Sequence, residues 1–257
     1  MKKLILGTLI IIIPLAIYAL LISRNQSTAP EKSKAAGLES PQVFSDNSNS
    51  ITIDNLTYSW FEVGNTDNLK LIPNFSEKLT SQEILDKEKC KFLSNSAFYS
   101  KANQPLGLVI TGGKTISPWQ QNSLFDGILS VNDMATPRIT RNIPQDGLRI
   151  AIQVGPILKE NSTFIPLKII DDKEARRVIA AVTGSNKLVF IVIYDKNSEY
   201  SGPLLADVPV ILKSFEQKSG IILADAINMD GGSASVFSSD GTKLSEFSPV
   251  GAFFCQL

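Results

Sequence analysis

The stretch Asn228-Met229-Asp230-Gly231-Gly232-Ser233-Ala234-Ser235 is the part of the chain around which the rest is arranged. It follows an apolar run at residues 221–224, which we interpret as the approach to a buried strand. Side chains alternate along a strand, so Asn228 and Asp230 are expected on one face. The two glycines permit a tight turn and a close approach by another group. The pattern predicts a strand that ends in a carboxylate-bearing turn. A purely structural strand end is the alternative, because Asp-Gly is common in turns.

The region just before this stretch has the patterns of a helix and a hairpin. Apolar residues in 208–219 recur at the spacing of one buried helical face, with Pro209 in the first turn. We expect Asp207 to cap this helix and Gly220 to end it. Two apolar runs, 178–182 and 188–194, are separated by a short glycine-containing turn, which predicts a hairpin.

Other apolar runs bounded by turn residues predict further strands, at 51–53, 57–63, 69–72, 105–110, 125–131, 148–154, 236–237 and 250–254. A short helix is expected after Thr80, where Glu83 stands at the capping-box position. Hairpins outnumber β-α-β units in this pattern. We therefore predict an α+β fold: a mixed, largely antiparallel sheet with two or three flanking helices, preceded by one transmembrane helix.

The N-terminal region differs in composition from the rest. Residues 4–22 carry no charge and approach the ~20 residues that span a bilayer as a helix. Two lysines precede them, which places the N-terminus in the cytoplasm. We predict a membrane anchor in 1–24, with a cleaved signal peptide as the alternative. Residues 25–50 have the composition of a flexible linker. The domain at 51–257 is then expected outside the cytoplasm, in the periplasm or at the cell surface, or secreted if the segment is cleaved.

The absence of histidine narrows the chemistry most. It excludes Ser-His-Asp and Cys-His nucleophile systems and histidine-ligated zinc. Acid–base chemistry near neutral pH must then come from carboxylates, Lys, Tyr or Cys with shifted pKa values. Basic and acidic residues balance at 25 each, so the sequence has no excess of positive charge that would predict nucleic acid as a partner.

The two cysteines, Cys90 and Cys255, are too few for an all-cysteine zinc site. A disulfide and two buried thiols both remain open.

Five short motifs occur along the chain in a fixed order: Asn95-Ser96-Ala97-Phe98-Tyr99, Pro105-Leu106-Gly107-Leu108, Gln153-Val154-Gly155-Pro156-Ile157-Leu158, Ala175-Arg176-Arg177-Val178-Ile179-Ala180 and Asn228-Met229-Asp230-Gly231-Gly232-Ser233. Together they resemble the motifs of the phosphodiester glycosidase family over about residues 55–257. There are departures. Ser96-Ala97 stand where the family pattern has two glycines, and Arg177 stands where it has threonine. These changes are expected to narrow the pocket.

The resemblance implies hydrolysis of a sugar-1-phosphodiester to a sugar and a phosphomonoester. It points to Asp230 as the catalytic carboxylate and to Arg176 as the group that grips the phosphate, since guanidinium can hold two oxygens at once. A salt bridge to a neighbouring acid is the structural alternative for Arg176. The expected substrate-binding residues are Asn95, Phe98, Gln153, Gly155, Asn228, Gly231, Gly232 and Ser233.

Several points stay open at this stage. Glycosidases commonly use a second carboxylate, and the sequence offers Glu62, Asp126, Asp133 and Asp172. No cofactor or metal is implied, although a hard cation at Asp230 is an alternative. The expected partners are a glycan or sugar-phosphodiester substrate and, through residues 4–22, a membrane. The competing functions are a non-catalytic glycan- or phosphate-binding envelope protein and a structural envelope protein.

Overall fold

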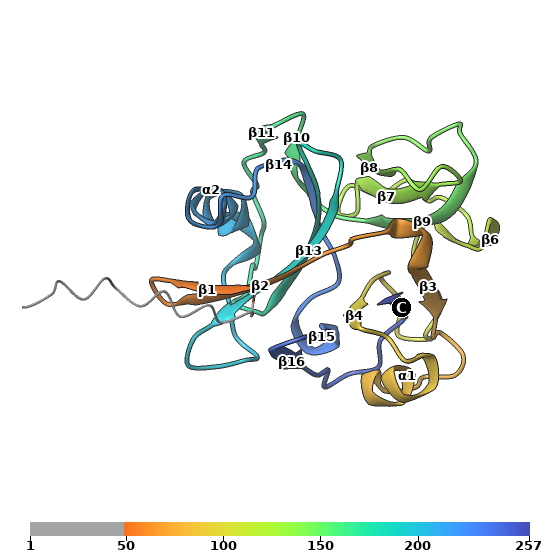
Figure 1. The fold of residues 1–257 in the computed structure, drawn as a ribbon, viewed down its shortest axis with the longest axis horizontal. Helices are drawn as coiled ribbons and strands as arrows, with labels where there is room; N and C mark the ends of the chain where they lie inside the picture. The colour runs from red at the N-terminus through yellow and green to blue at the C-terminus, as the bar shows by residue number, and fades with distance from the viewer. Residues whose placement is uncertain (1–48) are drawn as a thin grey trace, which may run out of the picture. The chain divides into compact units, whose positions relative to one another are not determined.

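The computed structural model describes residues 49–257, so the membrane segment predicted at 4–22 lies outside the described residues, as does nearly all of the predicted linker. The described part contains seventeen strands, two α-helices and three short 3-10 helices (Figure 1). The predicted α+β class is therefore wrong. The strands form three antiparallel sheets that bury their apolar faces mainly against one another, and few helices are needed to cover them. Neither α-helix in residues 49–257 is long and apolar enough to cross a membrane.

The largest sheet has seven strands and supplies the motif on which the cavity is built. Its order is β1 (Ser50–Ile53), β2 (Leu56–Glu62), β13 (Leu188–Asp195), β12 (Arg177–Thr183), β14 (Leu223–Asn228), β10 (Ile157–Glu160) and β11 (Thr163–Phe164). The predicted hairpin is confirmed as β12 and β13, in which Val178 pairs with Val192. Strand β14 pairs with β12 so that Asn228 lies opposite Ile179. This register brings the glycine turn beside the start of β12.

Two five-stranded sheets complete the fold, and they lie on the same side of the large sheet in Figure 1. One has the order β16 (Thr242–Leu244), β15 (Phe237–Ser239), β4 (Phe92–Asn95), β17 (Ala252–Gln256) and β3 (Leu69–Pro73). The other has the order β6 (Lys114–Ser117), β5 (Val109–Thr111), β9 (Leu148–Val154), β7 (Gly127–Asn132) and β8 (Pro137–Thr140). The 3-10 helices are η1 (Thr66–Asn68), η2 (Leu205–Asp207) and η3 (Gly232–Ala234).

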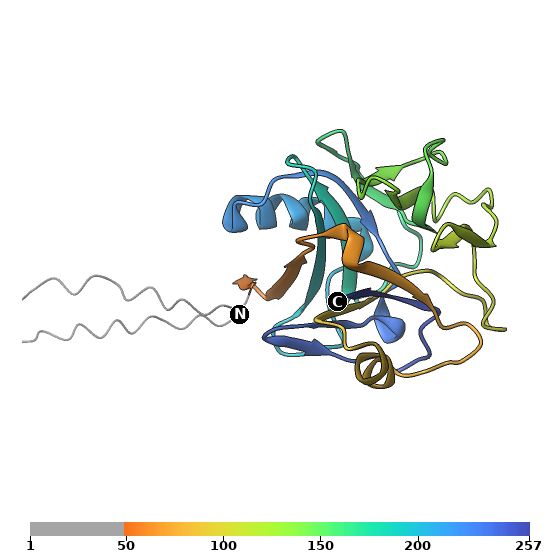
Figure 2. The ribbon, with the colours of Figure 1, turned by 45° about the vertical axis from the view of Figure 1, so that its right-hand side comes forward.

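Helix α2 (Val208–Ser219) covers the opposite face of the large sheet (Figures 1 and 2). Its buried residues Val208, Leu212 and Phe215 belong to one cluster with apolar side chains of β12, β13 and β14, as the helical spacing predicted. Gly220 ends the helix in the left-handed conformation, with φ of 76°, also as predicted. The expected cap at Asp207 is wrong. Its side chain makes no capping hydrogen bond, because η2 already continues the chain into the helix.

Helix α1 (Ser81–Glu88) packs on the sheet that contains β4 and β17. The predicted capping box is present, with Thr80 and Glu83 satisfying each other's backbone amides. A disulfide joins Cys90, just after the helix, to Cys255 of β17, with an S–S distance of 2.01 Å. The disulfide is therefore the alternative that the structure supports for the two cysteines.

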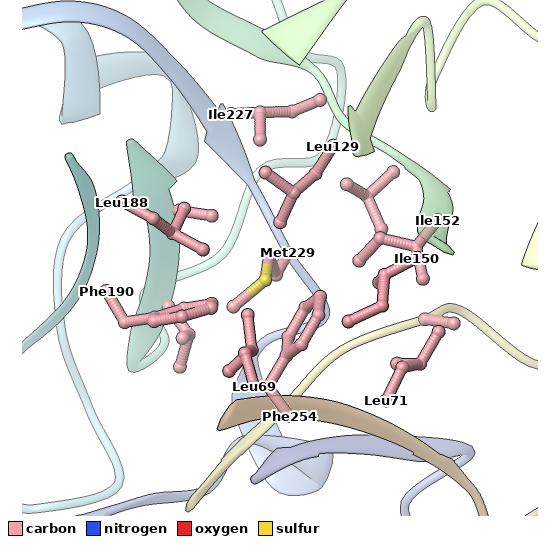
Figure 3. Close-up of a cluster of buried hydrophobic side chains, with 14 of the residues drawn as sticks. Leu69, Leu71, Leu129, Ile150, Ile152, Leu188, Phe190, Ile227, Met229 and Phe254 are labelled. Atoms are coloured by element: carbon pink, nitrogen blue, oxygen red, sulfur yellow. The ribbon is translucent and has the colours of Figure 1, made fainter. Parts of the chain in front are cut away.

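Met229 lies at the centre of the core where the three sheets meet (Figure 3). Figure 3 shows it between Leu188 and Phe190 of the large sheet, Leu129 and Ile150 of the second, and a third group at Leu69 and Phe254. The side chain is fully buried. The two residues on either side of Met229 line the cavity described below. As the strand alternation predicts, the side chain of Met229 packs in the core, whereas its neighbours Asn228 and Asp230 line the cavity.

Candidate active site

A cavity of about 870 Å³ opens where β14 ends and β7 and β12 begin. Loops supply most of its lining, at 98–101 after β4, 123–126 before β7 and 167–175 before β12. The turn after β9 and the glycine turn after β14 complete it. All five sequence motifs therefore contribute residues to one cavity. Of the predicted site residues, the lining contains Phe98, Gly155, Asn228, Asp230, Gly231, Gly232 and Ser233.

Asp230 carries the most perturbed carboxyl group of this cavity. Burial raises its pKa from the ordinary 3.8 to about 7, and a hydrogen bond from the amide of Gly231 to Oδ1, at 2.9 Å, opposes the rise. The residue still keeps partial exposure. A carboxyl group that titrates near neutral pH and reaches a cavity can exchange protons with a bound molecule.

Asn95 and Asn228 hold the backbone around Asp230. The fully buried Asn95 donates from Nδ2 to the carbonyl of Asp230 at 2.6 Å and accepts from the amide of Val236 at 2.8 Å. Asn95 is thus a positioning residue and does not line the cavity. Asn228 does line it, and its Nδ2 donates to the carbonyl of Gly155 at 3.0 Å. Its buried Oδ1 has no partner among residues 49–257 and is available to a bound hydroxyl group.

The glycine turn uses most of its own amides. Gly231 donates to the Asp230 carboxylate, and Gly232 donates to the carbonyl of Arg176 at 3.0 Å. A Cβ on Gly231 would lie only 3.1 Å from that carbonyl oxygen, a tight contact, so the close approach favours glycine. Ser233 is exposed at the cavity. The amides of Gly231 and Gly232 are thus already used within the protein, which leaves Ser233 as the residue of this turn that can donate to a bound anion.

Of the two adjacent arginines, Arg177 lines the cavity and Arg176 does not. Arg176 is fully buried, does not line the cavity, and donates to the hydroxyl and the carbonyl of Ser235, at 2.7 and 2.6 Å, and to two further carbonyls. Its guanidinium fixes the chain after the glycine turn and is not available to a phosphate. Arg177 lines the cavity instead, held by the carbonyl of Pro203 at 3.0 Å and by Asp172 at 3.3 Å.

Gln153 and Gly155 position the loop at 123–126, which lines the cavity. The buried Gln153 accepts from the amides of Leu108 and Gln120, at 3.1 and 3.0 Å, and donates to the carbonyl of Phe125 at 3.1 Å. It therefore orders the loop that carries Phe125 and does not line the cavity itself. A Cβ on Gly155 would lie 2.8 Å from the backbone of that same loop. Phe98 packs against Phe125 with ring centroids 5.7 Å apart, and both rings line the cavity.

Two of the four candidates for the second carboxylate line the cavity, Asp126 and Asp172, whereas Glu62 and Asp133 do not. Asp126 accepts from the amide of Ile157 at 2.9 Å and from Arg141 at 2.6 Å.

The pKa of Asp172 is shifted in the opposite direction to that of Asp230. Burial works against its ionisation, but hydrogen bonds from backbone amides, one from Ala206 at 2.8 Å, and the nearby Arg177 together lower its pKa. One cavity thus holds a carboxylate that stays ionised and a carboxyl group that titrates near 7. Such a divergence of pKa values marks acid–base sites.

Residues 49–257 contain no group of three or more acidic or cysteine side chains arranged to hold a metal ion. The cations that line the cavity are Lys101, Lys168, Lys173 and Arg177. These four side chains give the cavity basic groups that can contact an anionic group of a bound molecule.

Comparisons with known proteins gave a family match and similar solved structures. The family model described as phosphodiester glycosidase matches residues 88–252, more than half of the chain. A comparison with curated protein sequences found no match. Among solved structures, the fold is similar to the zebrafish N-acetylglucosamine-1-phosphodiester alpha-N-acetylglucosaminidase catalytic domain, auto-inhibited by its pro-peptide. The TM-score is 0.60 at 15% identity over 80% of each chain. A hypothetical protein from Synechocystis has a TM-score of 0.48 at 14% identity, over 79% of this chain and 62% of that one.

The fold and the carboxylate cavity thus belong to a glycosidase-type hydrolase, and the family match gives the class its name. The chain belongs to the phosphodiester glycosidase family. The resemblance drawn from the five motifs is confirmed.

Proposed function

We propose that the protein hydrolyses a sugar-1-phosphodiester at the anomeric carbon, outside the cytoplasm, and releases a sugar and a phosphomonoester. The observation that carries the proposal is the Asp230 carboxyl group, with a pKa of about 7, at the cavity of a chain that has no histidine. The name of the structurally similar zebrafish enzyme, which describes action on an N-acetylglucosamine-1-phosphodiester, supports the same bond as the target.

In this proposal Asp230 acts in its ionised form. A phosphomonoester is a good leaving group and departs with little protonation. Catalysis is therefore needed mainly for the attack of water on the anomeric carbon. Asp230 accepts a proton from water while the water oxygen bonds to that carbon. The bond from the carbon to the phosphate oxygen breaks, and its electron pair leaves with the phosphomonoester. Asp172 stays ionised and stabilises the positive charge that develops on the sugar ring.

The phosphate is assigned to Arg177 in place of Arg176. Arg177 lines the cavity, and its Cδ lies 4.0 Å from the position that a Cβ on Gly231 would occupy. Arg176 retains a supporting role through Ser235, because its guanidinium orders the chain that follows the glycine turn. This assignment keeps a guanidinium at the departing oxyanion, where it contributes most.

A location outside the cytoplasm is supported by the disulfide between Cys90 and Cys255. Disulfides persist in oxidising compartments and are rare in the cytosol.

Hydrolysis in ¹⁸O-labelled water followed by ³¹P NMR tests the proposal, because it identifies the bond that breaks. We expect the phosphomonoester from a sugar-1-phosphodiester to contain no label, since water attacks the sugar carbon. Label in the phosphate would identify a phosphodiesterase acting at phosphorus. Saturable binding without any product over a long incubation would instead favour the non-catalytic glycan- or phosphate-binding protein.

A further inference from the structure

One side of the cavity is apolar without belonging to the core. Leu106, Leu124, Phe125 and Ile169 all line the cavity, yet none of them belongs to the hydrophobic clusters formed by residues 49–257. Leu124 is 72% exposed, and Ile170, adjacent to this lining, is 91% exposed. We call the first four residues the apolar wall. Apolar side chains that are gathered at a cavity and absent from the core are typical of a binding surface.

The apolar wall stands next to the polar residues of the proposed reaction. The backbone of Phe125 and Asp126 lies directly against Gly155, and the carbonyl of Gly155 accepts from Asn228. Asn228 and Asp230 share a face of the strand end. The loop that carries Leu124 and Phe125 is therefore connected through Gly155 to Asn228, and the volume of about 870 Å³ leaves room beyond a single sugar and its phosphate.

The charges are arranged in a way that fits an anionic group between a polar and an apolar part. Lys168, next to Ile169 in the chain, and Lys173 both line the cavity, and Arg177 lies near the glycine turn. A second sugar would present hydroxyl groups to leucine, isoleucine and phenylalanine side chains, which offer no hydrogen bonds. Burying those hydroxyl groups without partners would cost affinity.

We propose that the aglycone, the second substituent of the phosphodiester, is apolar and lies on the apolar wall. This inference rests on the proposed function, since it names the substrate class of the same site. The substrate is then an amphipathic molecule, with a sugar at Asn228 and Asp230, a phosphate at Arg177 and an alkyl or prenyl chain along Leu106, Leu124, Phe125 and Ile169.

The test is a series of phosphodiesters of one sugar with methyl, butyl and octyl aglycones and with a second sugar as aglycone. Each is measured on the full-length protein for binding by calorimetry and for kcat/KM, below micelle-forming concentrations. Fully burying one methylene group is worth roughly fourfold in affinity, so we expect octyl to exceed methyl by at least about 30-fold. Equal values across the series, or preference for the sugar aglycone, would overturn the inference.

Two substitutions locate the effect on the wall. Leu124→Ser and Ile169→Ser are each expected to reduce the octyl-to-methyl ratio by about tenfold, whereas Met134→Ser, at a residue that is 76% exposed and outside the cavity, leaves the ratio unchanged. An unchanged ratio in both wall variants would contradict the inference. Binding also separates the two proposals. If no diester is hydrolysed, the proposed reaction fails, while the chain-length dependence of binding still decides the aglycone.

Discussion

At the scale of single residues, the surroundings of Asp230 matter more than its identity. Its carboxyl group is buried beside Gly231, and Asn95 fixes its backbone carbonyl. Burial raises the pKa, so the folded chain binds the proton more tightly than the unfolded chain does. The fold is therefore penalised for ionising this group. Such a cost is typical of residues kept for reaction rather than for stability.

This cost gives the first prediction. Asp230→Asn removes the ionisation and keeps the shape, so we expect the variant to be more stable than the parent protein at pH 8. The gain should be about 1–3 kcal/mol, discounted because the side chain is partly exposed. The penalty grows as pH rises from 3.8 to about 7 and is constant above that. Chemical unfolding at pH 4 and pH 8 checks it. A variant no more stable than the parent at pH 8 would contradict the raised pKa.

The sequence could identify Asp230 but not the roles of the neighbouring arginines. Strand alternation predicts that Arg176 and Arg177 point to opposite sides, but it does not say which side holds the cavity. That depends on the pairing of β12 with β14 and on the loop at 167–175, which are long-range features. The same limit applies to Gln153, whose partners at Leu108 and Gln120 are distant in sequence.

At the scale of elements, the turn between β9 and β10 sets the position of the loop at 123–126. A Cβ on Gly155 would lie 2.8 Å from Cα of Phe125 and from the amide of Asp126. We expect Gly155→Ala to displace this loop, to destabilise the protein by about 1–3 kcal/mol and to lower kcat/KM at least tenfold. Gly64→Ala is the matched control, because a Cβ there meets nothing within 4 Å. Thermal unfolding and kinetics on both variants measure the difference, and similar behaviour of the two would refute the account.

Local signals were sufficient for several elements. The spacing in 208–219, with Gly220 after it, predicted α2, and two apolar runs about a short turn predicted the β12–β13 hairpin. Asp207 was assigned a capping role that it does not have, since η2 leads directly into the helix. Caps depend on backbone angles one residue before the helix, and composition alone does not determine those angles.

At the scale of the whole molecule, Met229 joins the three sheets. Met229→Ala would leave a cavity where they meet, and we expect it to cost about 2–5 kcal/mol of the free energy of unfolding. Met134→Ala is the matched control, because Met134 is 76% exposed and should change stability by less than about 0.5 kcal/mol. Denaturant unfolding distinguishes the two. A loss below about 1 kcal/mol at Met229 would show that it does not hold the sheets together.

The disulfide acts at the same scale, because it links residues 165 positions apart. Reduction should lower the free energy of unfolding by about 2–5 kcal/mol. The comparison is thermal unfolding with and without reductant. A Cys90→Ser/Cys255→Ser variant should unfold at the same temperature in both conditions. A parent protein insensitive to reductant would contradict a closed disulfide.

The fold class was the least accessible from sequence. Buried antiparallel strands packed between sheets have near-continuous apolar runs, as in β12 and β13, and such runs do not reveal what covers them. The sheets cover one another here, and the helices cover only two surfaces. The ordered motifs identified the family correctly because they are contiguous in sequence, whereas the arrangement of the sheets depends on contacts between distant segments.

The rate of sugar release from a sugar-1-phosphodiester, compared between the parent protein and Asp230→Asn, decides whether Asp230 is the catalytic carboxylate. We predict a loss of at least about 10³-fold in kcat for the variant, with its fold intact. Asp133→Asn, a carboxylate outside the cavity, should retain the parent rate. The parent rate should also rise with pH to a plateau above about 7, where Asp230 is ionised. Equal turnover by Asp230→Asn and the parent protein would contradict the account.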